Sequence, residues 1–551
     1  MVQSNTKIKN KHGGQAIVEV LKKEGVKKIF GVPGESYLNV LDALYEENEI
    51  DFISARQEGG ASFMAESYAK ASGDVGVCSA TRGPGATNLS IGLHTAQQDS
   101  TPLVALIGQV ERPFKNREAF QEIDFNSFFN DICKWTIEID DANRIPEILH
   151  RAFHVARSGR PGPVLVSLPE DMQNDIVNND THGPIKVPKT CTDSDVIQEV
   201  AKELKQAKKP VIIAGGGVIL SNATKDLVTL SETIQAPVAT AFRRFHAFPN
   251  SHPNYIGALG LGACKEISEY IQDSDLVLAL GTKFSQMTTN DYSLINEQRS
   301  DLIHVDISPE SIGRVYTPTI PVVSDVRSFI VDLLKVVDQE ESDVRQSNLK
   351  EANEKYKEFS TPTLKGNKAY ANMTSVIDFI QKELPKDTII TSDSGNFFSW
   401  ISRYYKYDNG GKYFGPTSGA MGYGMPAAIG AKFFYPNKTV ISISGDGGFM
   451  MTPQEFETAV RYEIPIISIV INNNMYGTIH AHQEAKFPNR VIGTTLTNMN
   501  FSEYAKNLGG HGERVEKNEE IPKAFERVIE SGLPAIIEVM TDPTILSAKE
   551  E

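Results

Sequence analysis

The feature that most constrains the fold is a repeated alternation of short apolar strands with amphipathic helices. From Gly14 onward, segments with an apolar period of about 3.6 residues, such as AIVEVLKKEG and SYLNVLDALYEEN, alternate with strand-like segments such as KKIFGVPG, DFISARQE and VGVCSAT. This alternation predicts parallel sheets with helices on both faces. Because three such runs follow one another, we expect an α/β protein made of three doubly wound parallel-sheet domains.

Polar and charged stretches separate the three runs. NNDTHGPIKVPKTCTDSD interrupts the periodicity after the first run, and DQEESDVRQSNLKEANEKYKEF follows the second. The length of 551 residues suits three to four domains of roughly 150 residues each. The expected boundaries are an N-terminal extension at 1–13, a first domain at 14–180, a middle domain at 192–345 and a C-terminal domain at 368–545.

Composition and charge exclude several classes of protein. Hydrophobic residues make up 40% and charged residues 23%, as in ordinary globular proteins. The net charge of −15 would repel nucleic acid and anionic membranes, so we expect neither as a partner. The polar N-terminus lacks a signal-peptide pattern, and the four cysteines form no CxxC pair. A reducing cytoplasm is therefore the expected location.

Glycines and polar side chains follow two successive strands in the third run. Asp446 lies within GDGG, and Asn473 follows the next strand. The helix between them shows the pattern of a capping box, from Thr452 to Glu455. A right-handed crossover places both strand ends at one edge of the sheet, so Asp446 and Asn473 can share one ion. One carboxylate and one amide oxygen suit Mg²⁺, and backbone amides of Gly445, Gly447 and Gly448 suit a diphosphate.

At this point the chain resembles the thiamine diphosphate-dependent enzymes. GDGGFMMTPQEFETAVRYEIPIISIVINNN is similar to their diphosphate and metal motif, which implies Asp446, Asn473 and the backbone carbonyl of Met475 as Mg²⁺ ligands. ISARQEGGASFMAESYAKASG is similar to the segment with the catalytic glutamate, which maps to Glu58. In the family this carboxyl hydrogen-bonds the aminopyrimidine of the cofactor, whose nitrogen then removes the thiazolium C2 proton.

Six further segments resemble the acetolactate (acetohydroxyacid) synthase large subunits, in the same order. They are GVPGESYLNVLDAL, GVCSATRGPGATNLSIGL, DSTPLVALIGQV, EAFQEID, GRPGPVLVSLPED and TSGAMGYGMPAAIGA. The resemblance implies that pyruvate or another 2-oxo acid is decarboxylated and ligated to a second carbonyl. It also implies a homodimer or homotetramer with active sites at the dimer interface. The implied site residues are Gly34 near the reacting carbon, Phe120 and Gln121 in the active site, Gly419 and Met421 beneath the thiazolium, and Ser394, Gly395 and Asn396 near the diphosphate.

Several positions depart from the synthase pattern. GTKFSQM ends in Met287 where the synthases have an arginine that binds the second 2-oxo acid, so a charged acceptor needs another cation such as Lys283. His482 stands in place of a tryptophan and His94 in place of a small residue, and either can move protons near neutral pH. Phe397 replaces a histidine of the diphosphate region.

The middle domain and the reaction leave alternatives open. PVIIAGGGVI and GALGLGA resemble segments that hold FAD in the synthases, whereas other relatives bind ADP there or nothing. For the reaction, the alternative to the carboligase is a lyase or decarboxylase of another 2-oxo acid or 2-hydroxyacyl substrate. A non-catalytic regulatory subunit is disfavoured, because Glu58, Asp446 and Asn473 each have a separate chemical duty.

Overall fold

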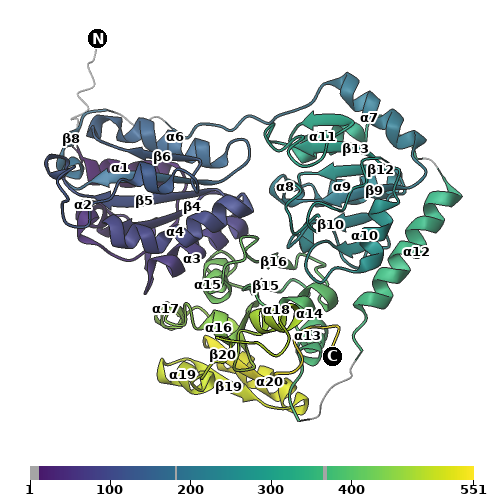
Figure 1. Cartoon of the computed structure of the whole chain (residues 1–551). Helices are drawn as coiled ribbons and strands as arrows, with labels where there is room; N and C mark the ends of the chain where they lie inside the picture. Colours follow the sequence, from purple (N-terminus) through teal and green to yellow (C-terminus); the bar gives the residue numbers. More distant parts are fainter. Residues whose placement is uncertain (1–10, 180–182, 299, 340, 364–368, 551) are drawn as a thin grey trace. The chain divides into compact units, whose positions relative to one another are not determined.

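The computed structural model describes residues 11–179, 183–298, 300–339, 341–363 and 369–550. It contains three six-stranded sheets in which every paired strand is parallel, flanked by helices (Figure 1), so the predicted α/β class is confirmed. Judged by which Cα atoms lie close together, the chain divides into two compact units. One comprises Met1–Pro188, Met425–Pro436 and Thr452–Ile464, and the other the remaining residues. Residues 1–10 of the expected N-terminal extension lie outside the described residues.

The first unit is built on a sheet of strand order β3-β2-β4-β5-β7-β6. Every residue of β5 and β7 is buried and most are apolar, as expected for central strands that are covered on both faces. Separately from this sheet, the short strands β1 and β8 form an antiparallel pair. The strands are β1 (Lys11–His12), β2 (Lys28–Gly31), β3 (Asp51–Ser54), β4 (Gly76–Thr81), β5 (Leu103–Gln109), β6 (Trp135–Glu138), β7 (Pro163–Pro169) and β8 (Ile176–Val177).

Helices cover both faces of this sheet. In Figure 1, α1 and α6 lie on one side of it and α3 and α4 on the other. Ile17, Leu149 and Phe153 from the first pair are fully buried in one apolar cluster with the sheet. The helices of this unit are α1 (Gly13–Lys23), α2 (Leu38–Tyr45), α3 (Glu58–Ser72), α4 (Arg82–Asp99), α5 (Phe125–Phe129), α6 (Ile145–Arg157), α17 (Glu455–Arg461) and, from its second residue, α15 (Gly424–Phe434).

The middle sheet, in the second unit, has the order β11-β10-β9-β12-β13-β14. Numbered along the chain, this is 3-2-1-4-5-6, the usual order of dinucleotide-binding sheets, whose direction reverses between β9 and β12. Its strands are β9 (Pro210–Ala214), β10 (Val238–Thr240), β11 (Tyr255–Ala258), β12 (Leu276–Leu280), β13 (Asp301–Asp306) and β14 (Ile320–Val323). Its helices are α7 (Ser194–Gln206), α8 (Gly216–Leu220), α9 (Thr224–Thr233), α10 (Lys265–Gln272), α11 (Val326–Leu333) and α12 (Asp343–Ser360).

The C-terminal sheet, also in the second unit, has the order β16-β15-β17-β18-β20-β19. Numbered along the chain this is 2-1-3-4-6-5, the same order as the N-terminal sheet. Its strands are β15 (Ile389–Ser392), β16 (Lys412–Phe414), β17 (Val440–Gly445), β18 (Ile467–Asn472), β19 (His511–Val515) and β20 (Ala535–Met540). Its helices are α13 (Met373–Glu383), α14 (Phe398–Tyr404), α16 (Asp446–Phe449), α18 (Gly477–Lys486), α19 (Phe501–Asn507) and α20 (Ile521–Ser531). No described helix combines the length and apolar character that a membrane span requires.

Helices α3 and α4 pack so closely that one contact admits only glycine. A Cβ at Gly92 would lie 2.1 Å from Ser62 Oγ and 2.3 Å from its Cβ. We therefore expect Gly92→Ala to lower the free energy of unfolding by about 1–3 kcal/mol, as overpacking does, measured by urea unfolding. Gly183→Ala is the control, because nothing lies within 4 Å of a Cβ there. An unchanged stability of Gly92→Ala would contradict the packing described.

Candidate cofactor site

The two predicted metal-binding residues lie at one edge of the C-terminal sheet. β17 and β18 pair in parallel, with Gly445 opposite Ile471, so their carboxyl ends are neighbours. Asp446 is the first residue of α16 and is buried, and Asn473 follows the last residue of β18. The neighbouring, parallel strand ends that the sequence predicted are therefore present.

A cavity of about 240 Å³ opens at this edge. It brings together segments that are far apart in the sequence, all within the second unit. The predicted residues that line it are Ser394, Gly395, Asn396, Gly419, Met421, Gly445, Asp446, Gly447, Gly448, Asn473 and Met475. Its walls also include residues that the sequence did not single out, among them Tyr370, Asn372, Trp400, Thr541 and Asp542.

The glycines of the cavity wall present bare backbone because side chains have no room there. A Cβ at Gly447 would lie 2.4 Å from the Tyr476 ring, and one at Gly448 would lie 2.5 Å from Asp393 Oδ2. The ten-residue helix α18 starts at the same wall with Gly477, and no side chain caps its amides. Free amides at a helix N-terminus attract anions, so this wall fits a diphosphate.

The electrostatics of Asp446 suit a cation. Burial raises the pKa of its carboxyl to about 6, although hydrogen bonds from Asn498 and the Gly447 amide oppose the shift. Among the described residues no group of three His, Cys, Asp or Glu side chains is arranged to hold a metal. A cation here would therefore take one carboxylate, the amide oxygen of Asn473, a backbone carbonyl and ligand oxygens, the hard set that Mg²⁺ prefers.

A second buried acid, Asp393, lies beneath the glycine loop. Its Oδ1 accepts a hydrogen bond from the Gly424 amide, while Oδ2 has no partner among the described residues. Burial raises its pKa to about 6. Nearby, the buried guanidinium of Arg243 donates to the Asp393 carbonyl over 3.1 Å and to Ser394 Oγ over 3.2 Å. Sequence reasoning missed both, although an acid directly after the strand IITS is a visible signal.

Glu58 occupies the corresponding edge of the N-terminal sheet, in the first unit. It is the first residue of α3, after β3, and Gln57 caps this helix through the Gly60 amide. Asn88 on α4 donates to Glu58 Oε2 over 3.0 Å. The carboxyl is half-buried, so it remains accessible to a ligand.

Three more predicted residues lie at this edge of the N-terminal sheet. A Cβ at Gly34 would lie 2.1 Å from Thr81 Oγ1, so only glycine fits there. Gln121 has a φ of 66°, and its carbonyl accepts from the Gly83 amide over 2.9 Å. Phe120 is 73% exposed.

Among the positions that depart from the synthase pattern, Phe397 lines the cavity and the other four lie outside its walls. His94 is exposed on α4, and His482 is exposed on α18, one turn beyond Ile479 and Thr478, which line the cavity. Met287 packs against the aromatic cluster that contains Phe242 and Phe398. Lys283, the alternative cation, is half-buried.

Glu455 corrects one local prediction. The helix that the sequence placed from Thr452 begins at Glu455, and its N-cap residue, Gln454, makes no side-chain cap. The Glu455 carboxyl instead accepts hydrogen bonds from the backbone amides of Arg56 and Gln57, at 2.9–3.2 Å, and from Thr458 Oγ1 at 2.8 Å. These amides immediately precede Glu58, so Glu455 supports the turn that presents it.

The fold and these sites define a thiamine diphosphate enzyme. The N-terminal TPP-binding, central and C-terminal TPP-binding domains of the thiamine pyrophosphate enzyme family match residues 11–128, 197–333 and 393–539. The chain therefore belongs to this family, and its cofactor is thiamine diphosphate.

Curated relatives are similar over nearly the whole chain. A probable acetolactate synthase large subunit of Methanocaldococcus jannaschii is 35% identical over 96% of this chain and 92% of its own. The acetolactate synthase isozyme 2 large subunit of Escherichia coli is 31% identical over 96% of both chains. The acetolactate synthase large subunit of Corynebacterium glutamicum is 33% identical over 96% of this chain and 86% of its own. The predicted resemblance to this group is confirmed.

The buried carboxyl of Glu455 leads to a prediction about pH. Burial raises its pKa from 4.5 to about 7, so the folded protein retains a proton that the unfolded chain releases. Stability from this group is present below pH 4.5 and is lost as the pH rises through about 7. We expect Glu455→Gln to remove about 3 kcal/mol of this pH dependence, measured by urea unfolding between pH 4.5 and 8. If the free energies of unfolding of the parent and of Glu455→Gln change with pH in parallel, the pKa of Glu455 is not raised in the folded protein.

Proposed function

We propose that this protein is a thiamine diphosphate- and Mg²⁺-dependent carboligase of the acetolactate synthase type. It decarboxylates a 2-oxo acid such as pyruvate and joins the remaining acyl unit to a second carbonyl. The observation that carries the proposal is the cavity that collects Asp446, Asn473, Met475 and the glycine loop at one sheet edge. The names of the relatives support the reaction type.

Each group of side chains has its task in this reaction. Bound thiamine diphosphate supplies an electron sink for cleavage of a carbon–carbon bond. Asp446, the Asn473 amide oxygen and the Met475 carbonyl hold Mg²⁺, and the backbone amides of Gly448 and of the α18 N-terminus hold the diphosphate. Met421 supports the thiazolium from the cavity wall. The Glu58 carboxyl holds the proton that passes to and from the aminopyrimidine nitrogen.

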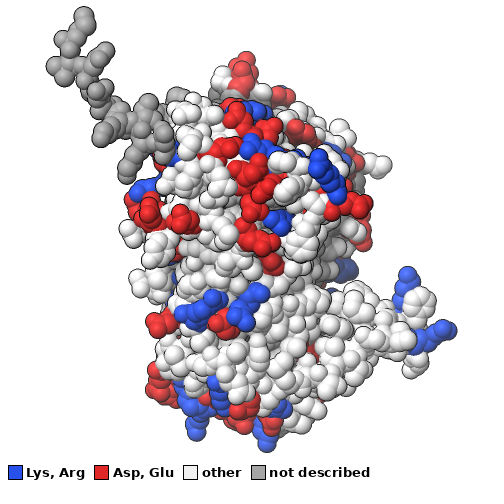
Figure 2. Space-filling model, turned by 90° about the vertical axis from the view of Figure 1, so that its left-hand side faces the viewer, with Lys and Arg blue, Asp and Glu red and all other residues white. Residues whose placement is uncertain are grey.

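We propose a homodimer, or a dimer of dimers, in which Glu58 of one copy serves the cofactor of the other. The first unit exposes apolar side chains around its Glu58 edge: Ile91 is 41% exposed, Phe114 51%, Phe120 73% and Phe128 49%. Groups of exposed apolar side chains are typical of protein–protein interfaces. On the face in Figure 2, acidic and basic side chains are interspersed without a continuous basic area, which supports a partner other than nucleic acid.

We propose that the middle sheet binds an adenine nucleotide, either FAD or ADP, and a middle domain that binds neither is the remaining alternative. A Cβ at Gly215 would lie 2.2 Å from the Gly281 carbonyl oxygen, and one at Gly217 would lie 2.7 Å from Gly281 Cα. These glycines follow β9 and β12, where the strand order reverses and dinucleotides bind in such sheets.

The four cysteines are free thiols, which supports a reducing, cytoplasmic location.

The reaction is tested by analysing the products of purified protein with thiamine diphosphate, Mg²⁺ and pyruvate, with and without FAD. We expect one acetolactate for each carbon dioxide released. Carbon dioxide or aldehyde without acetolactate would instead support a decarboxylase or lyase, the alternative suggested by Met287, which cannot bind a carboxylate as arginine does. Activity that requires added FAD would identify the dinucleotide.

The role of Glu58 is tested by Glu58→Gln, which keeps the shape of the side chain but cannot transfer the proton. We expect exchange of the cofactor C2 proton to slow by about 10²–10⁴-fold while cofactor binding stays close to that of the parent. Exchange is measured by NMR after acid quenching of the bound cofactor in D₂O. Glu46→Gln, at an exposed position just after α2, is the control. Equal exchange in parent and Glu58→Gln would remove Glu58 from the mechanism.

A further inference from the structure

A segment outside the glycine motif lies along the loop that carries the proposed metal ligands. Thr494 accepts a backbone hydrogen bond from Tyr476 over 2.8 Å, and Leu496 donates one to Asn474 over 2.8 Å. Met475 and Thr495 form an antiparallel bridge between these bonds. The backbone of Met475, whose carbonyl is a proposed ligand, is therefore held by a short ladder.

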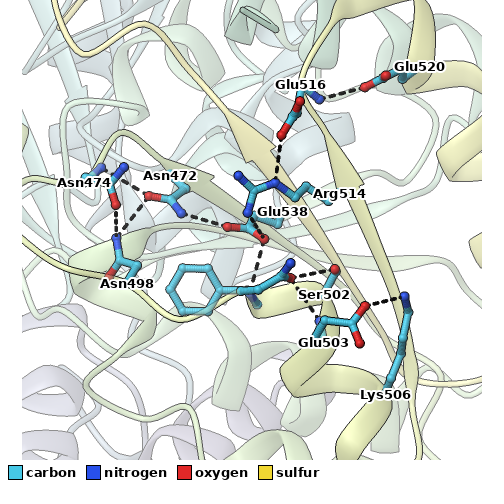
Figure 3. Close-up of polar contacts among 12 residues, drawn as sticks. Asn472, Asn474, Asn498, Ser502, Glu503, Lys506, Arg514, Glu516, Glu520 and Glu538 are labelled. Atoms are coloured by element: carbon cyan, nitrogen blue, oxygen red, sulfur yellow. Dashed lines mark hydrogen bonds and ion pairs between the residues drawn. The ribbon is translucent and has the colours of Figure 1, made fainter.

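Asn498 continues this segment and contacts Asp446 directly. Its Nδ2 lies 2.7 Å from Asp446 Oδ2, 3.0 Å from Asn472 Oδ1 and 3.2 Å from Asn474 Oδ1. Figure 3 shows Asn498 pointing at Asn472 and Asn474. The other oxygen of Asp446 accepts from the Gly447 amide over 3.0 Å. Hydrogen bonds to both oxygens fix the orientation of the carboxylate.

The direction of these bonds is set by a buried carboxylate further from the cavity. Glu538 on β20 is fully buried and accepts from Asn472 Nδ2 over 2.8 Å. Its other oxygen accepts from the Phe501 amide over 3.2 Å and lies 3.5 Å from Arg514 Nη1 (Figure 3). Both oxygens of Glu538 accept hydrogen bonds, so Asn472 turns its NH₂ group to Glu538 and its oxygen to Asn498. Asn498 is then left with its NH₂ group toward Asp446.

We propose that Asn498 is a positioning residue for the Mg²⁺ site. Oriented by Glu538 through Asn472, it holds the Asp446 carboxylate and the Asn472–Met475 loop in ligand geometry before the metal binds. The inference rests on the proposed Mg²⁺ site and extends it to a residue that the glycine motif does not contain. Groups that orient a ligand in this way affect metal affinity more than chemistry at saturation.

The test measures Mg²⁺ affinity through thiamine diphosphate binding. The chain has two tryptophans, Trp135 and Trp400, and Trp400 lies in the cavity wall. In a Trp135→Phe background, the fluorescence of Trp400 therefore reports cofactor binding. Mg²⁺ is titrated at fixed thiamine diphosphate. We expect Asn498→Ala to raise the half-saturating Mg²⁺ concentration about 10–100-fold, with a kcat at saturating Mg²⁺ within about threefold of the parent.

Two further variants separate positioning from other roles. Asn498→Asp keeps the shape of the side chain, but it loses the NH₂ donor and places a second negative charge beside Asp446. We therefore expect it to weaken Mg²⁺ binding at least as much as Asn498→Ala does. If it tightened Mg²⁺, Asn498 would act as a ligand and the proposal would fail. Asn500→Ala removes the N-cap of α19, which lowers stability, but we expect it to leave the Mg²⁺ constant within about twofold. Equal shifts in Asn500→Ala and Asn498→Ala would show a merely structural effect and overturn the proposal.

The outcomes also distinguish this inference from the function it rests on. If the parent binds thiamine diphosphate without Mg²⁺, the proposed metal site fails and this inference with it. If the parent requires Mg²⁺ and Asn498→Ala titrates like the parent, only the inference fails. Mg²⁺-dependent binding without acetolactate formation would leave the inference standing and refute the proposed reaction.

Discussion

The parallel pairing of β17 with β18 is the constraint on which the cofactor site depends. Their ladder runs without a register break from Ile441 opposite Ile467 to Gly445 opposite Ile471. Because parallel strands end on the same side, the loop after each one opens at the same edge. The two loops are not adjacent in the sequence, yet the ladder places Asp446 and Asn473 at neighbouring strand ends. A one-residue slip would turn every side chain of the strand to the opposite face and move its loop away from its neighbour.

The acidic side chains at this edge of the sheet are buried, and burial makes their ionised forms unfavourable. Asp446 and Asp393 are both buried, and burial raises the pKa of each to about 6. Ionised carboxylates are costly in such surroundings, and hydrogen-bond donors compensate part of the charge, as Asn498 and the Gly447 amide do at Asp446. A cation bound at this edge would stabilise the ionised form of Asp446, and this would couple metal binding to the stability of the domain.

The fold and the core of the site could be read from the sequence because their signals are local. Apolar periodicity predicted the three parallel sheets, and Asp446 and Asn473 each stand directly after a strand. Asn498 carries no such signal, since its contact with Asp446 depends on a segment that folds back onto the loop after β18. Glu455 was predicted to cap its own helix, but its carboxyl bonds to amides 398 and 399 residues away in the sequence. Local patterns do not show when a distant donor competes with a nearby one.

The boundaries of the two compact units do not follow the boundaries of the three sheets. Residues 425–436 and 452–464 lie in sequence among the elements of the C-terminal sheet but belong to the unit of the N-terminal sheet. The backbone therefore passes from one unit to the other five times instead of once. A single linker would allow one unit to swing or unfold while the other stays intact. Five covalent crossings tie the two together, so cutting the chain between residues 180 and 192 would not release two independent domains.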